Sequence, residues 1–208
     1  MDAKENLLSR LRSLRADLLS KLDGLDEYQV RRPMTPTGTN LLGLVKHVAS
    51  VELGYFTEVF GREPGRALPW FDDDAEPDAD LWVAAGETRE EILDLHRYSA
   101  EVSDATIAEL DLDAAGEVPW WPPERRQVTL QQILVHMLVE TARHTGQADI
   151  IRESIDGRAG MGPERPEPHR SLRRGVGGAR RGHRGSRPSG RPVSDTALLR
   201  CRPPLGER

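Results

Sequence analysis

Glu140 and His144 lie four residues apart in the stretch LVETARHTGQADI, residues 138–150. If this stretch is helical, the two side chains lie one turn apart and lean to the same face. A carboxylate and an imidazole so placed supply two ligands for a divalent metal, and a neighbouring helix can supply the third. Three protein ligands leave one position open, which is typical of a catalytic site. The other interpretation is a solvated helix edge, because pairs with this spacing are common by chance.

His47 is the candidate for the third ligand. It lies between Val45 and Val48 in an apolar stretch, residues 40–60, that predicts another helix. His136 is a competitor, because it precedes Glu140 by one further turn. His136 and His144 are about 12 Å apart along a helix axis, so they do not share one ion. Spacing alone does not choose between these two histidines, and a half-buried structural imidazole is the alternative for each.

The elements that must position these side chains are helices. Apolar residues at spacings of three and four predict helices at about 3–24, 40–60, 88–110 and 130–155. No segment predicts a strand. We therefore expect an all-α fold, a four-helix bundle, over residues 1–160.

Helix boundaries are predicted by capping residues. Thr39 is the expected N-cap of the second helix. The third and fourth helices each begin with the pattern of a capping box, Thr88 with Glu91 and Thr129 with Gln132. The second helix is expected to end at Gly61 and the fourth at Gly157.

Two long connections join these helices. The first, residues 61–86, is acidic and proline-rich, but it is too apolar for a free linker and is expected to pack across the bundle. Its tryptophans, with Trp120 and Trp121 of the second connection, either line a pocket mouth over the site or cap the core. Glu52 is interpreted as a solvated side chain rather than a partner that orients an imidazole. Tyr55 is interpreted as a core aromatic residue and Arg143 as a surface residue.

Charge divides the chain into two parts. Residues 1–160 carry 17 Lys and Arg against 30 Asp and Glu, a net charge of -13, whereas residues 161–208 carry a net charge of +8. The acidic part does not suit nucleic acid, since phosphate binding needs a basic face. The Arg-, Gly- and Pro-rich residues 161–208 are predicted to be disordered. They suit either an arm that binds nucleic acid or anionic surfaces, or an end encoded by GC-rich DNA read out of frame.

Composition also bears on the compartment. Cys201 is the one cysteine, so no disulfide framework is possible, and this fits a reducing cytoplasm. The N-terminal stretch alternates charge and leucine and lacks the apolar core of a signal peptide. No apolar run reaches 18 residues, so no membrane span is predicted.

Three stretches carry a family resemblance: RPMTPTGTNLLGLVKHVASVELGYF (32–56), PWFDDDAEPDADLW (69–82) and VTLQQILVHMLVETARHTGQADIIRE (128–153). In their order and spacing they resemble the DinB/YfiT-like superfamily, specifically its actinobacterial mini-circle-protein-type branch, which is related to mycothiol-dependent maleylpyruvate isomerase. The resemblance covers residues 1–158. It implies a four-helix bundle in up-down-down-up order and a homodimer.

The resemblance also implies a metal site. Its pattern places the ligands at His47, Glu140 and His144, with zinc or nickel as the ion, and leaves His136 outside the site. It implies a thiol-dependent S-transferase or isomerase that uses a low-molecular-weight thiol such as mycothiol as co-substrate and acts on a small molecule. The alternative is a non-catalytic metal-binding or stress-response protein with the same fold. The chain departs from the family after the fourth helix, where relatives keep folded sequence.

Overall fold

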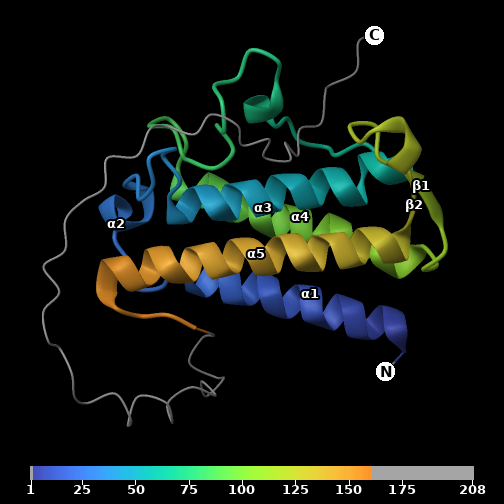
Figure 1. Ribbon diagram of the computed structural model, residues 1–208, viewed down its shortest axis with the longest axis horizontal. Helices are drawn as coiled ribbons and strands as arrows, with labels where there is room; N and C mark the ends of the chain where they lie inside the picture. Colours follow the sequence, from blue (N-terminus) through green and yellow to red (C-terminus); the bar gives the residue numbers. More distant parts are fainter. Residues whose placement is uncertain (1, 161–208) are drawn as a thin grey trace, which may run out of the picture. The chain divides into compact units, whose positions relative to one another are not determined.

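A computed structural model describes residues 2–160 of the chain (Figure 1). The prediction of an all-helical body is confirmed, since long helices dominate it and the two strands are short. The helices are α1 (Ala3–Ser20), α2 (Glu27–Arg31), α3 (Leu41–Phe56), α4 (Arg89–Glu109) and α5 (Leu130–Asp156). Short 3₁₀ helices lie at Glu58–Phe60, Pro69–Phe71 and Pro123–Arg125.

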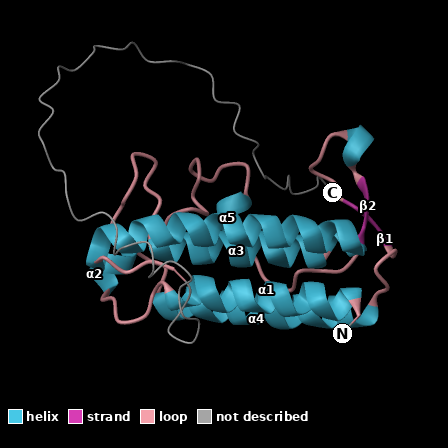
Figure 2. Ribbon diagram, turned by 60° about the horizontal axis from the view of Figure 1, so that its bottom comes forward, coloured by secondary structure: helices cyan, strands magenta, loops and turns pink. Residues whose placement is uncertain are grey.

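The four long helices pack side by side, with α3 against α4 and α5 and with α1 against α5 and α4 (Figures 1 and 2). Near the end of α5, Arg152 donates a hydrogen bond to the carbonyl of Lys21, just beyond the end of α1. At the start of α4, Arg89 donates to the carbonyl of Leu22. Helices α1 and α5 therefore run in one direction and α4 in the other. Tyr55, late in α3, packs against His136, early in α5, so α3 also runs opposite to α5.

Helix α3 is the centre of the bundle, because every one of its residues is buried. It is mostly apolar, as a helix enclosed by neighbours requires. The charged side chains within it have partners. Lys46 forms an ion pair with Glu87 (2.6 Å), and Glu52 forms one with Arg15 (2.8 Å). The partners offset the cost of burying these charges.

The helix caps largely follow the sequence pattern. The capping boxes of Thr88 with Glu91 and of Thr129 with Gln132 are both present. Gly157 ends α5 with a positive φ of 78°, which glycine adopts without strain. The N-cap of α3 is Asn40 and not Thr39, so that prediction was wrong by one residue. Helix α3 ends at Phe56, so the prediction that it ends at Gly61 was also wrong, and Gly61 ends the 3₁₀ helix Glu58–Phe60 instead.

Two short strands were not predicted. Residues Ala115–Glu117 (β1) pair antiparallel with Gln127–Thr129 (β2) at the end of the bundle (Figure 2). Three residues are too few to show an alternating pattern, so the sequence carried no signal for them. Gly116 belongs there for a steric reason, since a Cβ atom on it would lie 2.9 Å from atoms of Val59 and Phe60.

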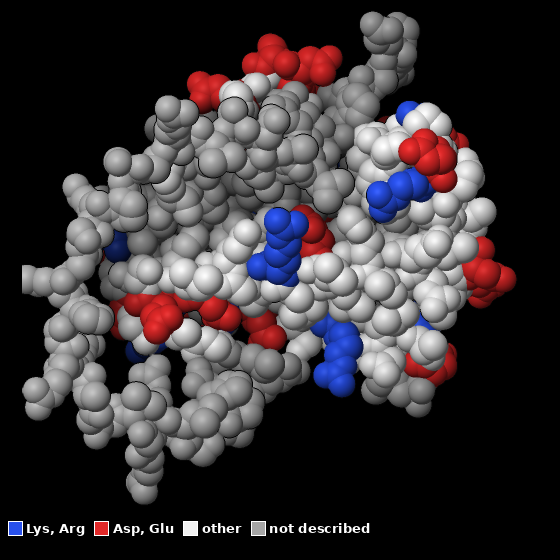
Figure 3. Space-filling model, in the orientation of Figure 1, with Lys and Arg blue, Asp and Glu red and all other residues white. Residues whose placement is uncertain are grey.

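The connection at residues 61–86 packs across α3, as expected, and we call it the α3–α4 loop. Lys46 anchors it, because its Nζ donates to the carbonyls of Ala79 (2.9 Å) and Trp82 (3.2 Å) and lies over the ring of Trp70. Acidic residues of the loop such as Asp73 are exposed. Figure 3 shows acidic side chains at the upper edge, where Figure 1 draws this loop.

None of the helices in residues 2–160 combines the length and the apolar character that a bilayer crossing needs. The predicted disordered segment, residues 161–208, lies outside the described residues.

Candidate metal centre

The polar centre of the bundle lies between two apolar clusters. On α3, Val45 and Val48 belong to one cluster, and Val51 belongs to the other. On α5, Ala148 belongs to the same cluster as Val45, and Met137 belongs to the same cluster as Val51. The residues between these positions therefore face one another with apolar walls on both sides, where electrostatic interactions are stronger than in water.

His47, Glu140 and His144 meet in this centre. Each offers one ligand atom, and these three atoms lie within 4.8 Å of one another. The Oε1 atom of Glu140 lies 2.9 Å from Nε2 of His144 and 3.4 Å from Nε2 of His47. The two imidazole rings stand edge to face with their centroids 4.4 Å apart. The structure thus brings together the three residues that the sequence analysis singled out.

Two further side chains orient the imidazoles. Nδ1 of His47 lies 2.6 Å from Oδ2 of Asp80, in the α3–α4 loop, and Nδ1 of His144 lies 2.8 Å from Oε1 of Gln147. Both partners are acceptors, so each Nδ1 donates its proton. With the protons held there, the lone pairs of both Nε2 atoms can face the common centre, which is the arrangement of histidine ligands in metalloproteins.

The electrostatics of the centre favour a positive charge. Burial alone lowers the pKa of His47, but hydrogen bonds and charge from Asp80 and Glu140 outweigh it and raise the pKa to about 9. Hydrogen bonds from His144 and His47 hold the pKa of Glu140 well below its usual range. Two carboxylates therefore surround the imidazole of His47, and either a proton or a metal cation satisfies them.

The donor set fits a divalent metal. Two imidazole nitrogens and one carboxylate oxygen suit zinc, and also nickel, iron or manganese. The three side chains are largely buried, and Nδ1 of each histidine is already hydrogen-bonded. Among residues 2–160, no fourth His, Cys, Asp or Glu belongs to this group. Such a three-donor arrangement leaves room for a small ligand.

His136 lies outside this centre. Its ring packs against Tyr55 at 4.7 Å and against Trp121 at 5.2 Å between centroids. The hydroxyl oxygen of Tyr55 accepts hydrogen bonds from the indoles of Trp121 (3.1 Å) and Trp120 (3.4 Å). Tyr55 is therefore the core aromatic residue that the sequence predicted. Both tryptophans pack on it, and Trp120 also lines a cavity.

The interpretation of Glu52 as a solvated side chain was wrong. Glu52 is 2% exposed, and its carboxylate pairs with Arg15, which also binds Asp104 at 2.7 Å. The sequence indicated the apolar face of α1 but gave no reason to expect Arg15 to point inward. Arg143 is exposed, as expected.

Asp80 is the residue of the candidate centre that the sequence analysis missed. It lies among the acidic residues of the α3–α4 loop. One signal in the sequence could have identified it: Ala79 and Leu81 on either side are apolar in an otherwise polar stretch, which indicates that this part of the loop packs against the bundle. Residue spacing cannot predict a pairing across 33 positions.

The fold and the centre together define a DinB-like helical bundle with three potential metal ligands on two helices. A comparison with protein families matches residues 6–157 to the family described as Mycothiol-S-transferase. The chain belongs to this family, which confirms the resemblance to the DinB/YfiT-like proteins.

A solved structure shares the fold. It is described as the crystal structure of the conserved protein of locus from Enterococcus faecalis, and the alignment has a TM-score of 0.53 at 18% sequence identity. It covers 76% of this chain and 99% of that one. No curated protein matches the chain.

Proposed function

We propose that this protein is a metal-dependent enzyme that uses a low-molecular-weight thiol of the mycothiol type, either as an S-transferase or as an isomerase. The observation that carries the proposal is the convergence of His47, Glu140 and His144, whose donor atoms lie within 4.8 Å of one another. Membership in the Mycothiol-S-transferase family supports the thiol. Zinc is the metal that the donor set suits best, and nickel is the second candidate.

In this proposal the three side chains hold the ion, and Asp80 and Gln147 keep both imidazoles in the correct tautomer. The bound ion supplies a Lewis acid that lowers the pKa of the thiol, so that the thiolate is available at neutral pH. The apolar clusters on both sides keep bulk water away from the nucleophile. The substrate would be a small electrophile that reacts with this thiol.

Metal content tests the ligand assignment. The purified protein and the variants His144→Ala and His136→Gln are compared by elemental analysis. We expect stoichiometric metal in the wild type and in His136→Gln, which removes a histidine from the same helix but outside the centre. His144→Ala is expected to lose the metal. Equal occupancy in all three proteins would contradict the assignment.

A turnover panel tests the chemistry. Mycothiol is offered with epoxides, alkyl halides and maleyl-type acids, and the loss of free thiol and the formation of product are followed. We expect turnover that depends on the metal. Tight metal binding without turnover across the whole panel would instead support the non-catalytic, metal-binding alternative.

The proposal includes a homodimer in the cytoplasm. Three large apolar side chains, Val135, Val139 and Ile150, are between 46% and 68% exposed on α5, and a partner subunit would cover them. A reducing compartment keeps the thiol co-substrate available. Light scattering of the wild type against Val139→Glu tests the dimer, because a buried charge at that position would dissociate it.

A further inference from the structure

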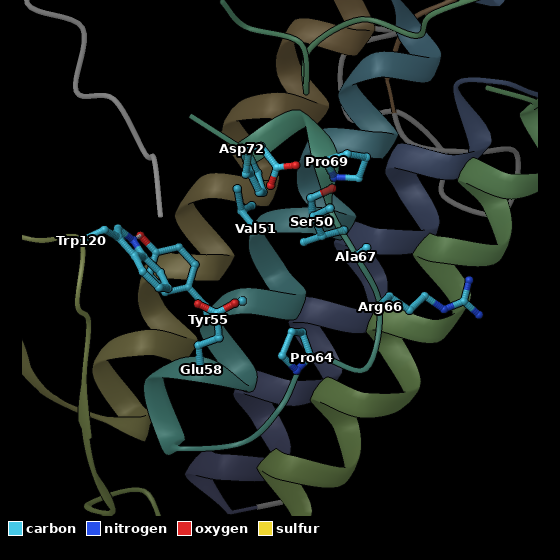
Figure 4. A pocket seen from close by; sticks show the side chains of 13 residues that line it. Ser50, Val51, Tyr55, Glu58, Pro64, Arg66, Ala67, Pro69, Asp72 and Trp120 are labelled. Carbon is cyan, nitrogen blue, oxygen red and sulfur yellow. Dashed lines mark hydrogen bonds between the residues drawn. The ribbon is translucent and has the colours of Figure 1, made fainter. Parts of the chain in front are cut away.

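A cavity of about 260 Å³ lies beside α3 (Figure 4). One wall is α3, the opposite wall is residues 64–72 of the α3–α4 loop, and Trp120 closes one side. Most of its surface is apolar and is contributed by residues such as Val51, Leu68, Phe71 and Trp120. Cavities of this kind bind the apolar body of a small molecule.

The cavity follows α3 from the turn after His47 onward. Its lining residues on α3 follow His47 by three, four, seven and eight positions, from Ser50 to Tyr55, and Glu58 lies in the 3₁₀ helix that follows. Positions with this spacing lie on one helix face, so the cavity continues along the same face that presents His47. Val51 lies one turn beyond His47, about 6 Å along the axis. The Ser50 and Val51 end of the cavity is therefore the end nearer to His47 along the helix.

The charges at the cavity disfavour an anion. Two carboxylates line it, those of Glu58 and Asp72. Among the lining residues, Arg66 is the cationic one, and its guanidinium pairs with Asp94 at 2.7 Å and lies over the ring of Tyr98 at 4.4 Å. Figure 4 shows the Arg66 side chain extending away from the other labelled residues. None of the described lining residues is thus placed to pair with a carboxylate of the substrate.

We propose that this cavity holds the body of the electrophile, and that the electrophile is an uncharged compound with an apolar group of one to two rings. This inference rests on the proposed function and narrows it to S-transfer rather than isomerisation of maleyl-type dianions. The size agrees, because an apolar cavity of about 150 Å³ holds benzene. With a benzylic chloride, the thiol sulfur forms the new C–S bond, chloride leaves with the electrons of the C–Cl bond, and the thiol proton passes to water.

Binding of unreactive analogues tests the cavity without turnover. Methyl 4-methylbenzoate and 4-methylbenzoate share one ring and differ in charge. We expect the ester to bind at least tenfold more tightly than the anion to the protein with and without zinc, measured by NMR titration. Equal binding, or tighter binding of the anion, would overturn the inference. Asp72→Asn should reduce the discrimination, whereas Asp73→Asn, at the exposed neighbouring residue, should not.

Two glycines provide a matched pair of variants. A Cβ atom at Gly54 would meet only Trp120, at 3.8 Å, so a side chain there enters the cavity without touching backbone. A Cβ atom at Gly146, also helical, would meet nothing within 4 Å. We expect Gly54→Leu to weaken ester binding at least tenfold and Gly54→Ala to weaken it less, with zinc content unchanged. Gly146→Ala is expected to bind the ester as the wild type does. Normal ester binding by folded Gly54→Leu would contradict the proposal.

Turnover measurements distinguish failure of the cavity inference from failure of the proposed function. Methyl 4-(chloromethyl)benzoate, 4-(chloromethyl)benzoate and iodoacetamide, which has no ring, are offered with mycothiol. We expect Gly54→Leu to lower kcat/KM for the neutral ring compound only. Turnover of all three without preference would overturn the cavity inference and leave the proposed function standing. Tight ester binding with no turnover of any of the three would overturn the proposed function and leave the cavity assignment standing.

Discussion

His47 is the residue of the candidate centre that faces two carboxylates at once. Asp80 and Glu140 lie 2.6 Å and 3.4 Å from its two nitrogens. Without a metal this arrangement holds a proton, and with a metal the Nε2 proton must leave. Proton and cation therefore compete for the same position.

This competition predicts opposite pH dependences. The pKa of His47 is raised from 6.5 to about 9, so the protonated imidazole stabilises the metal-free protein fully below pH 6.5. That contribution, on the order of 3 kcal/mol at about 1.4 kcal/mol per pKa unit, is lost as the pH rises toward 9. With stoichiometric zinc, the metal-dependent part of the stability should instead grow over the same range. Urea unfolding at a series of pH values measures both slopes, and His47→Gln should abolish both. A metal-free slope that is unchanged in His47→Gln would contradict the assignment.

Asp80 is predicted to tune the affinity of the centre. Asp80→Asn keeps an acceptor for Nδ1 of His47 but removes the negative charge. We expect zinc affinity to fall about 10- to 100-fold, the usual loss when a partner of a metal-bound histidine is changed. Competition with a chromophoric chelator measures it, and Asp73→Asn controls for net charge. Equal losses in both variants would indicate a general charge effect.

At the scale of elements, the α3–α4 loop depends on a single glycine of α3. A Cβ atom on Gly43 would lie 2.1 Å from the carbonyl oxygen of Leu81, a backbone atom that cannot move alone. The close approach brings the loop against the helix, and Asp80 is carried on the same segment. A residue without a side chain at position 43 is therefore required for the loop, and Asp80 with it, to approach α3 this closely.

Gly43→Ala is expected to destabilise the protein by about 1–3 kcal/mol, the range for overpacking in a core. Because the displaced segment carries Asp80, zinc affinity should fall as well. Thermal unfolding and chelator competition measure the two effects. Gly146→Ala is the control, since it adds the same methyl group in open space and should raise helix stability by up to about 1 kcal/mol. Unchanged stability of Gly43→Ala would contradict the predicted clash.

The sequence predicted the four long helices and two of the capping boxes, because apolar spacing and capping residues act locally, but it missed the short helix α2. It also identified His47, Glu140 and His144 as candidates, although the spacing alone left His136 open. The contacts that it could not predict join distant segments: Asp80 with His47, Arg15 with Glu52, and the loop backbone with Gly43. Each depends on how the loop or α1 packs on α3, which no local pattern encodes.

For the whole molecule, residues 1–160 are predicted to be sufficient for folding and metal binding. A variant that lacks residues 161–208 should match the full chain in melting temperature and zinc content, because the described contacts of the bundle and centre lie within the shorter chain. Retention on DNA at low and high salt tests the alternative of a nucleic-acid-binding arm, since phosphate contacts weaken steeply with salt. Loss of metal from the shorter chain would contradict the prediction.

The α3–α4 loop furnishes both the hydrogen-bond acceptor of His47 and one wall of the neighbouring cavity. A change in that segment is therefore expected to affect metal binding and substrate binding together. Trp120 belongs to the connection after α4 and contacts none of the three ligands by hydrogen bond or ring stacking among the described interactions. Homologues that diversify their electrophiles while retaining the same cation are expected to vary at that second connection.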